Sequence, residues 1–305
     1  MKPELEGIFP ITPGAFTDKG EIDVDGYTKV ISAMIEAGCA GITLFGIAGE
    51  YYKLNLEEEI TFIEVTVDTA KKKNKPCIIS NTRHSTEVAV KWAKEIEKRG
   101  ADCMMVLPPF FLKPGGQELY DHMRRVSEAV SIPVMIQYAP DQTGVPIDPN
   151  VFKKLKTDAE NILYYKIECK PPGHYITKLI DLTDGNIRVF VGNAGFQMIE
   201  GFDRGASGVM PGPSMFDIYV QIFDYYRNGK RADAVGLHKD LVYMLNHIRQ
   251  NVEMIISFEK YLLKKRGLLQ SDYCRQPTYR LDEVDKRIFE EIYQTVKQHF
   301  IAAAG

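Results

Sequence analysis

The chain has 305 residues, of which 45% are hydrophobic and 26% are charged, and its formal net charge is −3. This composition is typical of a globular protein, and the charge gives no electrostatic reason to expect nucleic acid or an anionic membrane as a partner. No run reaches the ~18 apolar residues of a membrane span. The sequence begins without the long apolar stretch of a signal peptide, and its five cysteines form no CxxC pair. We therefore expect a cytoplasmic protein with reduced thiols.

Eight short apolar runs predict eight β-strands, spaced far enough apart for one β-α unit each. They cover residues 7–12, 41–46, 76–81, 103–108, 133–138, 162–167, 187–192 and 207–212. An alternation of strand and helix that repeats eight times favours a closed α/β barrel, the (β/α)8 or TIM barrel. An open doubly wound sheet is the alternative.

Helical patterns fill the intervals between these runs. Residues 23–37 carry apolar side chains on one helical face. Asn55 followed by Glu58 has the spacing of a capping box, which predicts the start of a second helix. Ser85 is expected to cap a third helix over residues 86–99.

The apolar runs end before residue 226, and helical periodicity continues to the end of the chain. We therefore predict a barrel over residues 1–225 that carries the active site. Residues 226–305 are expected to form a C-terminal helical extension packed on the barrel, too small and polar for a separate catalytic domain. In such barrels the chemistry lies at the carboxyl ends of the strands.

A lysine stands where the sixth run, ILYYKI, should be buried. A cation inside a strand is penalised unless it is paired or loses its proton. The ordinary explanation of Lys166 is a strand-end lysine that extends to solvent. Its place at the rim of the predicted barrel favours another, because a neutral amine can attack the carbonyl of a 2-keto acid and form an imine.

Three motifs carry a resemblance to a known family: FGIAGEYYKLNLEEE (45–59), IPVMIQYAPDQTGV (132–145) and NILYYKIE (161–168). The chain resembles, as a divergent member, the dihydrodipicolinate synthase / N-acetylneuraminate lyase family of class I aldolases. The resemblance implies a TIM barrel, with Lys166 as the residue that forms the Schiff base. It also implies a small-molecule 2-keto acid substrate, no cofactor beyond the covalent imine, and a homotetramer built as a dimer of dimers.

The resemblance also implies a set of substrate-binding residues. The turn that contains Gly46, Ile47 and Ala48 would hold the carboxylate of a pyruvyl unit with the backbone N–H groups of Ile47 and Ala48. Phe111 stands where the family places a tyrosine that reaches in from a neighbouring subunit. Gln142 replaces the arginine that serves the second substrate of the synthase, which argues against that activity.

The groups that would move protons differ from the family pattern. The position of the family's fifth-strand tyrosine falls on Gln137, with Tyr138 one step further. Side chains alternate along a strand, so both cannot point inward unless a bulge intervenes.

Glu168 lies two residues beyond Lys166, on the same strand face, and is a candidate general acid and base. A salt bridge with Lys166 or Lys170, or an exposed carboxylate at the rim, is the structural alternative. Asn193, after the seventh run, could bind a substrate hydroxyl or serve only a turn.

No metal is expected, because the six histidines show no ligand spacing. We predict a Schiff-base-forming lyase, either an aldolase or a dehydratase, that acts on a 2-keto acid through Lys166. The apolar mouth suits an aromatic or weakly hydroxylated keto acid, and a deoxy-sugar acid is the other candidate. The alternatives are a catalytically lapsed member that binds a keto acid as a sensor or scaffold and, less favoured, 4-hydroxy-tetrahydrodipicolinate synthase.

Overall fold

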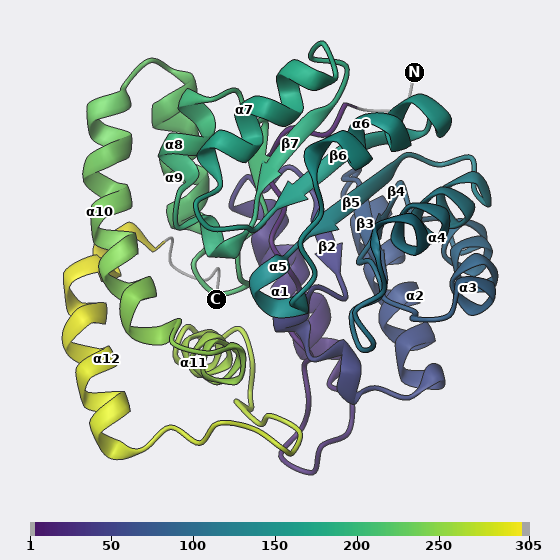
Figure 1. The fold of residues 1–305 in the computed structure, drawn as a ribbon. Helices are drawn as coiled ribbons and strands as arrows, with labels where there is room; N and C mark the ends of the chain where they lie inside the picture. Colours follow the sequence, from purple (N-terminus) through teal and green to yellow (C-terminus); the bar gives the residue numbers. More distant parts are fainter. Residues whose placement is uncertain (1–3, 301–305) are drawn as a thin grey trace. The chain divides into compact units, whose positions relative to one another are not determined.

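The computed structural model describes residues 4–300. Each strand lies inside one of the eight predicted runs (Figure 1). The strands are β1 (Gly7–Ile8), β2 (Ile42–Leu44), β3 (Cys77–Asn81), β4 (Cys103–Val106), β5 (Val134–Tyr138), β6 (Ile162–Ile167), β7 (Arg188–Val191) and β8 (Gly208–Val209). The fold is the predicted (β/α)8 barrel with a C-terminal helical appendage.

Helices follow the strands in the expected alternation. The α-helices are α1 (Val24–Glu36), α2 (Leu56–Lys72), α3 (Thr86–Lys98), α4 (Gly116–Glu128), α5 (Pro140–Thr143), α6 (Pro149–Asp158), α7 (Gly173–Leu182), α8 (Met198–Asp203), α9 (Phe216–Arg227), α10 (Arg231–Ile248), α11 (Val252–Lys265) and α12 (Glu283–Val296). The short 3-10 helices are η1 (Ile47–Gly49), η2 (Tyr51–Lys53), η3 (Asn193–Gly195) and η4 (Lys297–His299).

The chain divides into two compact units. The first contains Pro76–Met210 and the described residues before Gly7, and the second contains Gly7–Lys75 and the chain from Pro211 onward. The boundary expected from the sequence, a barrel over residues 1–225 and an extension over 226–305, stays a prediction.

In the first unit the strands β3 to β8 are parallel, and each pairs with the next in chain order. The pairing of β5 with β6 sets Gln137 beside Lys166. One irregularity in this pairing falls at Val134 and Met135. Because it lies at the start of β5, side chains alternate normally from Met135 to Tyr138.

In the second unit the chain around β1 pairs with that around β2, through a parallel bridge between Ile11 and Thr43. Helix α10 packs against α9 and α12 (Figure 1). The helix after β2 begins as predicted, because Asn55 accepts the Glu58 N–H at 2.9 Å and Glu58 accepts the Asn55 N–H at 3.0 Å.

The start of α3 is only half as predicted. Ser85 occupies the N-cap position, but its side chain makes no capping hydrogen bond. Its hydroxyl instead bonds the Glu87 carboxylate at 3.2 Å. The expectation of a side-chain cap was therefore wrong, because Ser85 donates to the Glu87 carboxylate while its oxygen accepts no helix N–H.

Helix α11 of the appendage buries a carboxyl group, that of Glu259, which is 2% exposed. One oxygen accepts the Ser214 N–H at 2.8 Å. Burial raises the pKa of Glu259 to about 7, although hydrogen bonds from Ser214 and the charge of Arg266 act in the opposite direction. The folded protein therefore holds this proton more tightly than the unfolded chain does.

This raised pKa predicts a pH dependence of stability. A carboxyl whose pKa is higher in the folded state favours folding at low pH, and the advantage is lost as the pH rises through the folded value. The free energy of unfolding of the wild type and of Glu259→Gln can be measured with denaturant at about pH 5 and about pH 8. From the lower to the higher pH, the wild type should lose about 2 kcal/mol more of this free energy than the variant does. An equal difference at both pH values would contradict this prediction.

Candidate active site

The end of β6 carries a buried ion pair. Lys166 is 3% exposed, and its Nζ lies 3.3 Å from Glu168 Oε1. The two side chains therefore share a strand face, as their spacing predicts. The salt bridge that the sequence offered as the structural alternative is present, and it joins Glu168 to Lys166. Lys170 instead pairs with Asp141, at 2.9 Å.

Both oxygens of Glu168 are held from neighbouring strands. The Gln137 amide of β5 donates to Oε2 at 2.7 Å, and the backbone N–H of Asn193 after β7 donates to Oε1 at 3.0 Å. Burial alone would raise the pKa of Glu168, but the charge of Lys166 and these hydrogen bonds outweigh it and lower the pKa. Glu168 is therefore a carboxylate at neutral pH and can accept a proton.

The backbone leaves little room around this carboxylate. A Cβ atom on Gly192 would lie 2.2 Å from Glu168 Cγ, so no larger residue fits there without moving the carboxylate. The close approach of the β7 end is what brings the Asn193 N–H to Glu168. A glycine before Asn193 is thus part of how the site is built.

The structure shows which of two adjacent side chains meets the ion pair. Gln137 contacts Glu168, whereas Tyr138 stacks on Tyr175 with ring centroids 4.6 Å apart. The Tyr138 hydroxyl accepts the Ile147 N–H at 3.4 Å, and burial raises the pKa of this phenol. Tyr138 therefore has a structural partner, and Gln137 takes the place beside the carboxylate.

Near the end of β7, both amide atoms of Asn193 and one amide atom of Gln197 are buried without partners in the described part of the chain. Neither the amide oxygen nor the amide nitrogen of Asn193 has a hydrogen-bond partner among residues 4–300, and the same is true of Gln197 Oε1. Asn193 and Ala194 have positive φ angles of 56° and 55°. Such strain and unpaired polar groups are costly and concentrate at functional sites. The sequence pattern gave no signal for Gln197.

The second unit holds the turn expected to bind a carboxylate. It forms η1, in which the Gly49 N–H bonds the Gly46 carbonyl at 2.8 Å. The N–H groups of Ile47 and Ala48 precede this bond, so they have no acceptor within the turn. A Cβ on Gly46 would lie 2.6 Å from Ile11, so close packing also requires this glycine. Carboxylate binding stays a prediction.

Two further candidate residues lie at the surface. Phe111 is 79% exposed and Leu112 is 85% exposed, in the loop after β4. Gln142 is exposed on α5. Nothing in this geometry assigns Phe111 or Gln142 to the substrate, so their binding roles stay predictions.

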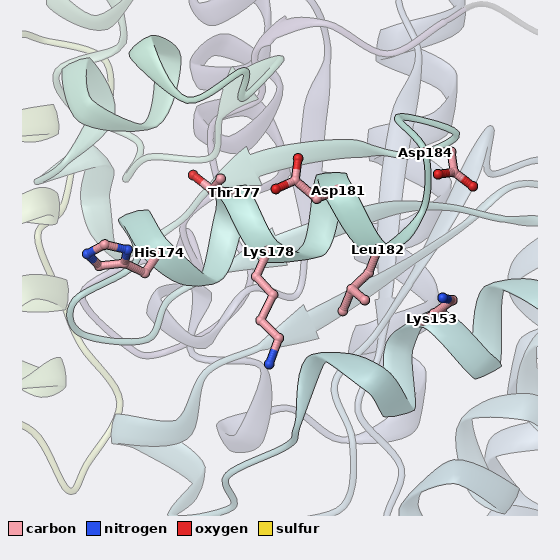
Figure 2. A pocket seen from close by; sticks show the side chains of 7 residues that line it. All are labelled: Lys153, His174, Thr177, Lys178, Asp181, Leu182 and Asp184. Atoms are coloured by element: carbon pink, nitrogen blue, oxygen red, sulfur yellow. The ribbon is translucent and has the colours of Figure 1, made fainter.

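The first unit has a hollow along α6 and α7 (Figure 2). Its lining residues carry charges of both signs, because Lys153 and Lys178 are basic and Asp181 and Asp184 are acidic. This mixture favours no single ligand class, and the lining of the hollow includes neither Lys166 nor Glu168.

Within residues 4–300, no group of three or more His, Cys, Asp and Glu could hold a metal ion. No helix described in that range could cross a membrane.

A buried lysine beside a carboxylate at the end of a barrel strand suits a lyase that forms an imine with its substrate. Comparison identifies the family: the model described as the dihydrodipicolinate synthetase family matches residues 4–298, and the chain belongs to this family. The predicted class, a Schiff-base-forming lyase of 2-keto acids, is thereby confirmed.

Two relatives match most of the chain. L-2-keto-3-deoxyarabonate dehydratase of Azospirillum brasilense is 26% identical over 280 residues, which cover 90% of this chain and 89% of the relative. A probable 2-dehydro-3-deoxy-D-pentonate aldolase of Escherichia coli is 26% identical over 287 residues, 93% of this chain and 94% of the relative. The crystal structure of a dihydrodipicolinate synthase from Rhodopseudomonas palustris matches with a TM-score of 0.89 and 27% identity, over 96% of this chain and 98% of that one.

The position of Tyr138 predicts the effect of removing its hydroxyl. Tyr138→Phe should leave turnover within about 3-fold of the wild type, because the phenol bonds a backbone N–H and does not reach the ion pair. Steady-state kinetics on a substrate found by the screen below would measure this. A loss of about 100-fold or more would show that Tyr138 takes part in proton transfer.

Proposed function

We propose that this enzyme is a dehydratase of 2-keto-3-deoxy acids, in which Lys166 forms the imine and Glu168 moves the protons. The observation that carries this proposal is the buried pair itself, with Lys166 Nζ 3.3 Å from Glu168 Oε1. Glu168 is fixed from two sides, by Gln137 and by the Asn193 backbone. A fixed carboxylate beside the amine can act on the carbon next to the imine.

The reaction begins when Glu168 takes a proton from the Lys166 ammonium. The neutral amine then adds to the C2 carbonyl of the substrate. Glu168 returns its proton to the resulting hydroxyl, which leaves as water, so that a protonated imine forms and Glu168 is again a carboxylate. Glu168 next removes a proton from C3, and the C–H electron pair becomes the enamine. The enamine expels the C4 hydroxyl, which leaves as water with a proton from the Glu168 carboxylic acid. Hydrolysis of the unsaturated imine frees Lys166 and the dehydrated keto acid.

The type of proton-transfer group favours dehydration over aldol cleavage. Cleavage requires a base that takes a proton from an alcohol, and a carboxylate with a lowered pKa is a weak base for that step. Dehydration requires removal of a C3 proton that the imine has made acidic, followed by protonation of a leaving hydroxyl. A carboxylate and its acid suit both steps, and Tyr138, the alternative base, has its hydroxyl at the Ile147 N–H.

Binding groups for the rest of the substrate complete the proposal. The N–H groups of Ile47 and Ala48 would hold the substrate carboxylate. The unpartnered amide of Asn193 would bind a substrate hydroxyl further along the carbon chain of the keto acid. A relative named as a dehydratase of a 2-keto-3-deoxy sugar acid, similar over 90% of this chain, supports a deoxy-sugar acid over an aromatic one.

We propose that the protein works in the cytoplasm as a homotetramer built from two dimers. The exposed side chains of Phe111 and Leu112 support an interface between subunits, because large apolar groups are seldom left together in solvent. In the assembly Phe111 would help to close the site of the neighbouring subunit.

Trapping of the imine tests the first half of the proposal. Borohydride reduction in the presence of pyruvate should give a stable adduct on Lys166, detected by peptide mass spectrometry, and no adduct in Lys166→Met. Lys170→Met is the matched control, because Lys170 is exposed and pairs with Asp141. This variant should form the adduct on Lys166 as the wild type does. An unmodified Lys166 at saturating pyruvate would overturn the proposal.

Product analysis with Glu168→Gln tests the second half. Incubation with a set of 2-keto-3-deoxy acids should release a dehydrated keto acid, and Glu168→Gln should reduce that rate about 100-fold or more. The pyruvate adduct should form more slowly in Glu168→Gln but should reach the wild-type level after long incubation. Release of pyruvate would indicate an aldolase instead. An adduct without any turnover would indicate a lapsed family member, and condensation with a second substrate would indicate 4-hydroxy-tetrahydrodipicolinate synthase.

A further inference from the structure

Helix α11 places a lysine in the interior of the second unit. Lys260 is 1% exposed, although it belongs to the polar C-terminal appendage and lies outside the motifs that identify the family chemistry. A buried ammonium is costly to desolvate and is retained where its partners compensate it. Its partners therefore indicate what it does.

The contacts of Lys260 lead to the turn that follows β2. Its Nζ pairs with Glu50 Oε1 and donates to the Tyr273 carbonyl at 2.9 Å. The same ammonium lies 4.5 Å from the centroid of the Phe16 ring. A carboxylate, a carbonyl and an aromatic face thus surround it, which fits a cation held in one place.

Glu50 in turn joins the two short helices of that turn. It ends η1 and begins η2, with a left-handed φ of 58°. This conformation is strained for any residue other than glycine, so Glu50 keeps it only where surrounding contacts hold the residue in place. The other oxygen of Glu50, Oε2, accepts from Lys53 Nζ and from the Arg275 N–H, each at 3.2 Å.

The charges around Glu50 make Lys260 its main compensation. Lys53 is shared, because its Nζ also lies 2.8 Å from Glu253. Lys260 donates otherwise to a neutral carbonyl, that of Tyr273. Without Lys260, the cations near Glu50 would be Lys53, which Glu253 shares, and Arg275, whose guanidinium pairs with Glu58. The buried carboxylate would then lose compensation, and we expect it to move.

We propose that Lys260 is a positioning residue, which fixes Glu50 and thereby orients the Ile47 and Ala48 N–H groups toward the substrate carboxylate. This inference rests on the proposed function, in which that turn binds the carboxylate. It gives α11 a role in substrate affinity. A merely structural role would be to hold the appendage in place, with an effect on stability alone.

The test compares Lys260→Met with Lys264→Met, a lysine of the same helix that is largely exposed and pairs with Asp272 at 2.8 Å. The pyruvate concentration that gives half-maximal borohydride trapping at Lys166 should rise about 10-fold or more in Lys260→Met, with the adduct at saturation unchanged. Lys264→Met should match the wild type. Lys260→Met/Glu50→Gln should recover part of the loss, because no buried carboxylate is then left unpaired.

If Lys260→Met does not fold, Glu50→Gln and Lys260→Arg replace it, with weaker pyruvate binding expected for the first and near-normal binding for the second. A lower melting temperature with unchanged half-saturation would overturn the inference and leave the proposed function standing. If the wild type gives no adduct, the proposed function fails. Pyruvate binding by saturation-transfer NMR in a Lys166→Met background then decides the role of Lys260, supporting it if binding weakens and overturning it if binding is unchanged.

Discussion

The ion pair between Lys166 and Glu168 is the interaction on which the rest of the site depends. Two opposite charges buried together repay their loss of hydration only when the geometry is close and the remaining polar atoms are bonded. Gln137 and the Asn193 backbone supply those bonds. Gln137 donates to the carboxylate, and the glycine before Asn193 leaves the room that the carboxylate occupies.

The second unit also contains a buried carboxylate, that of Glu50 in the turn that follows β2. Glu50 is buried beside Lys260 and Lys53, and its carboxylate holds a turn that local sequence alone would not stabilise. In each unit a buried carboxylate, Glu168 just after β6 and Glu50 in the turn after β2, is compensated by lysine and by a backbone N–H. In the proposed function the Lys166–Glu168 pair takes part in the chemistry, whereas the Lys260–Glu50 pair is proposed to fix a turn. By that proposal, Lys260 would give the helical appendage an effect on substrate affinity.

The sequence was sufficient to predict where the strands lie, because each strand falls within a short apolar run that can be recognised locally. The shared face of Lys166 and Glu168 also followed from a local rule, the two-residue period of a strand. The orientation of Gln137 and Tyr138 did not, because it depends on where β5 pairs with β6. The partner of Lys260 and the unpaired Oε1 of Gln197 depend on contacts between distant segments, which no local pattern encodes.

Proton exchange at the carbon beside the imine tests the central claim most directly. Pyruvate incubated with the enzyme in deuterium oxide, and followed by NMR, should exchange its methyl protons with the wild type. Exchange should stop in Lys166→Met and slow about 100-fold or more in Glu168→Gln. Exchange at the wild-type rate in Glu168→Gln would contradict the account, because the carboxylate beside the lysine would then take no part in moving that proton.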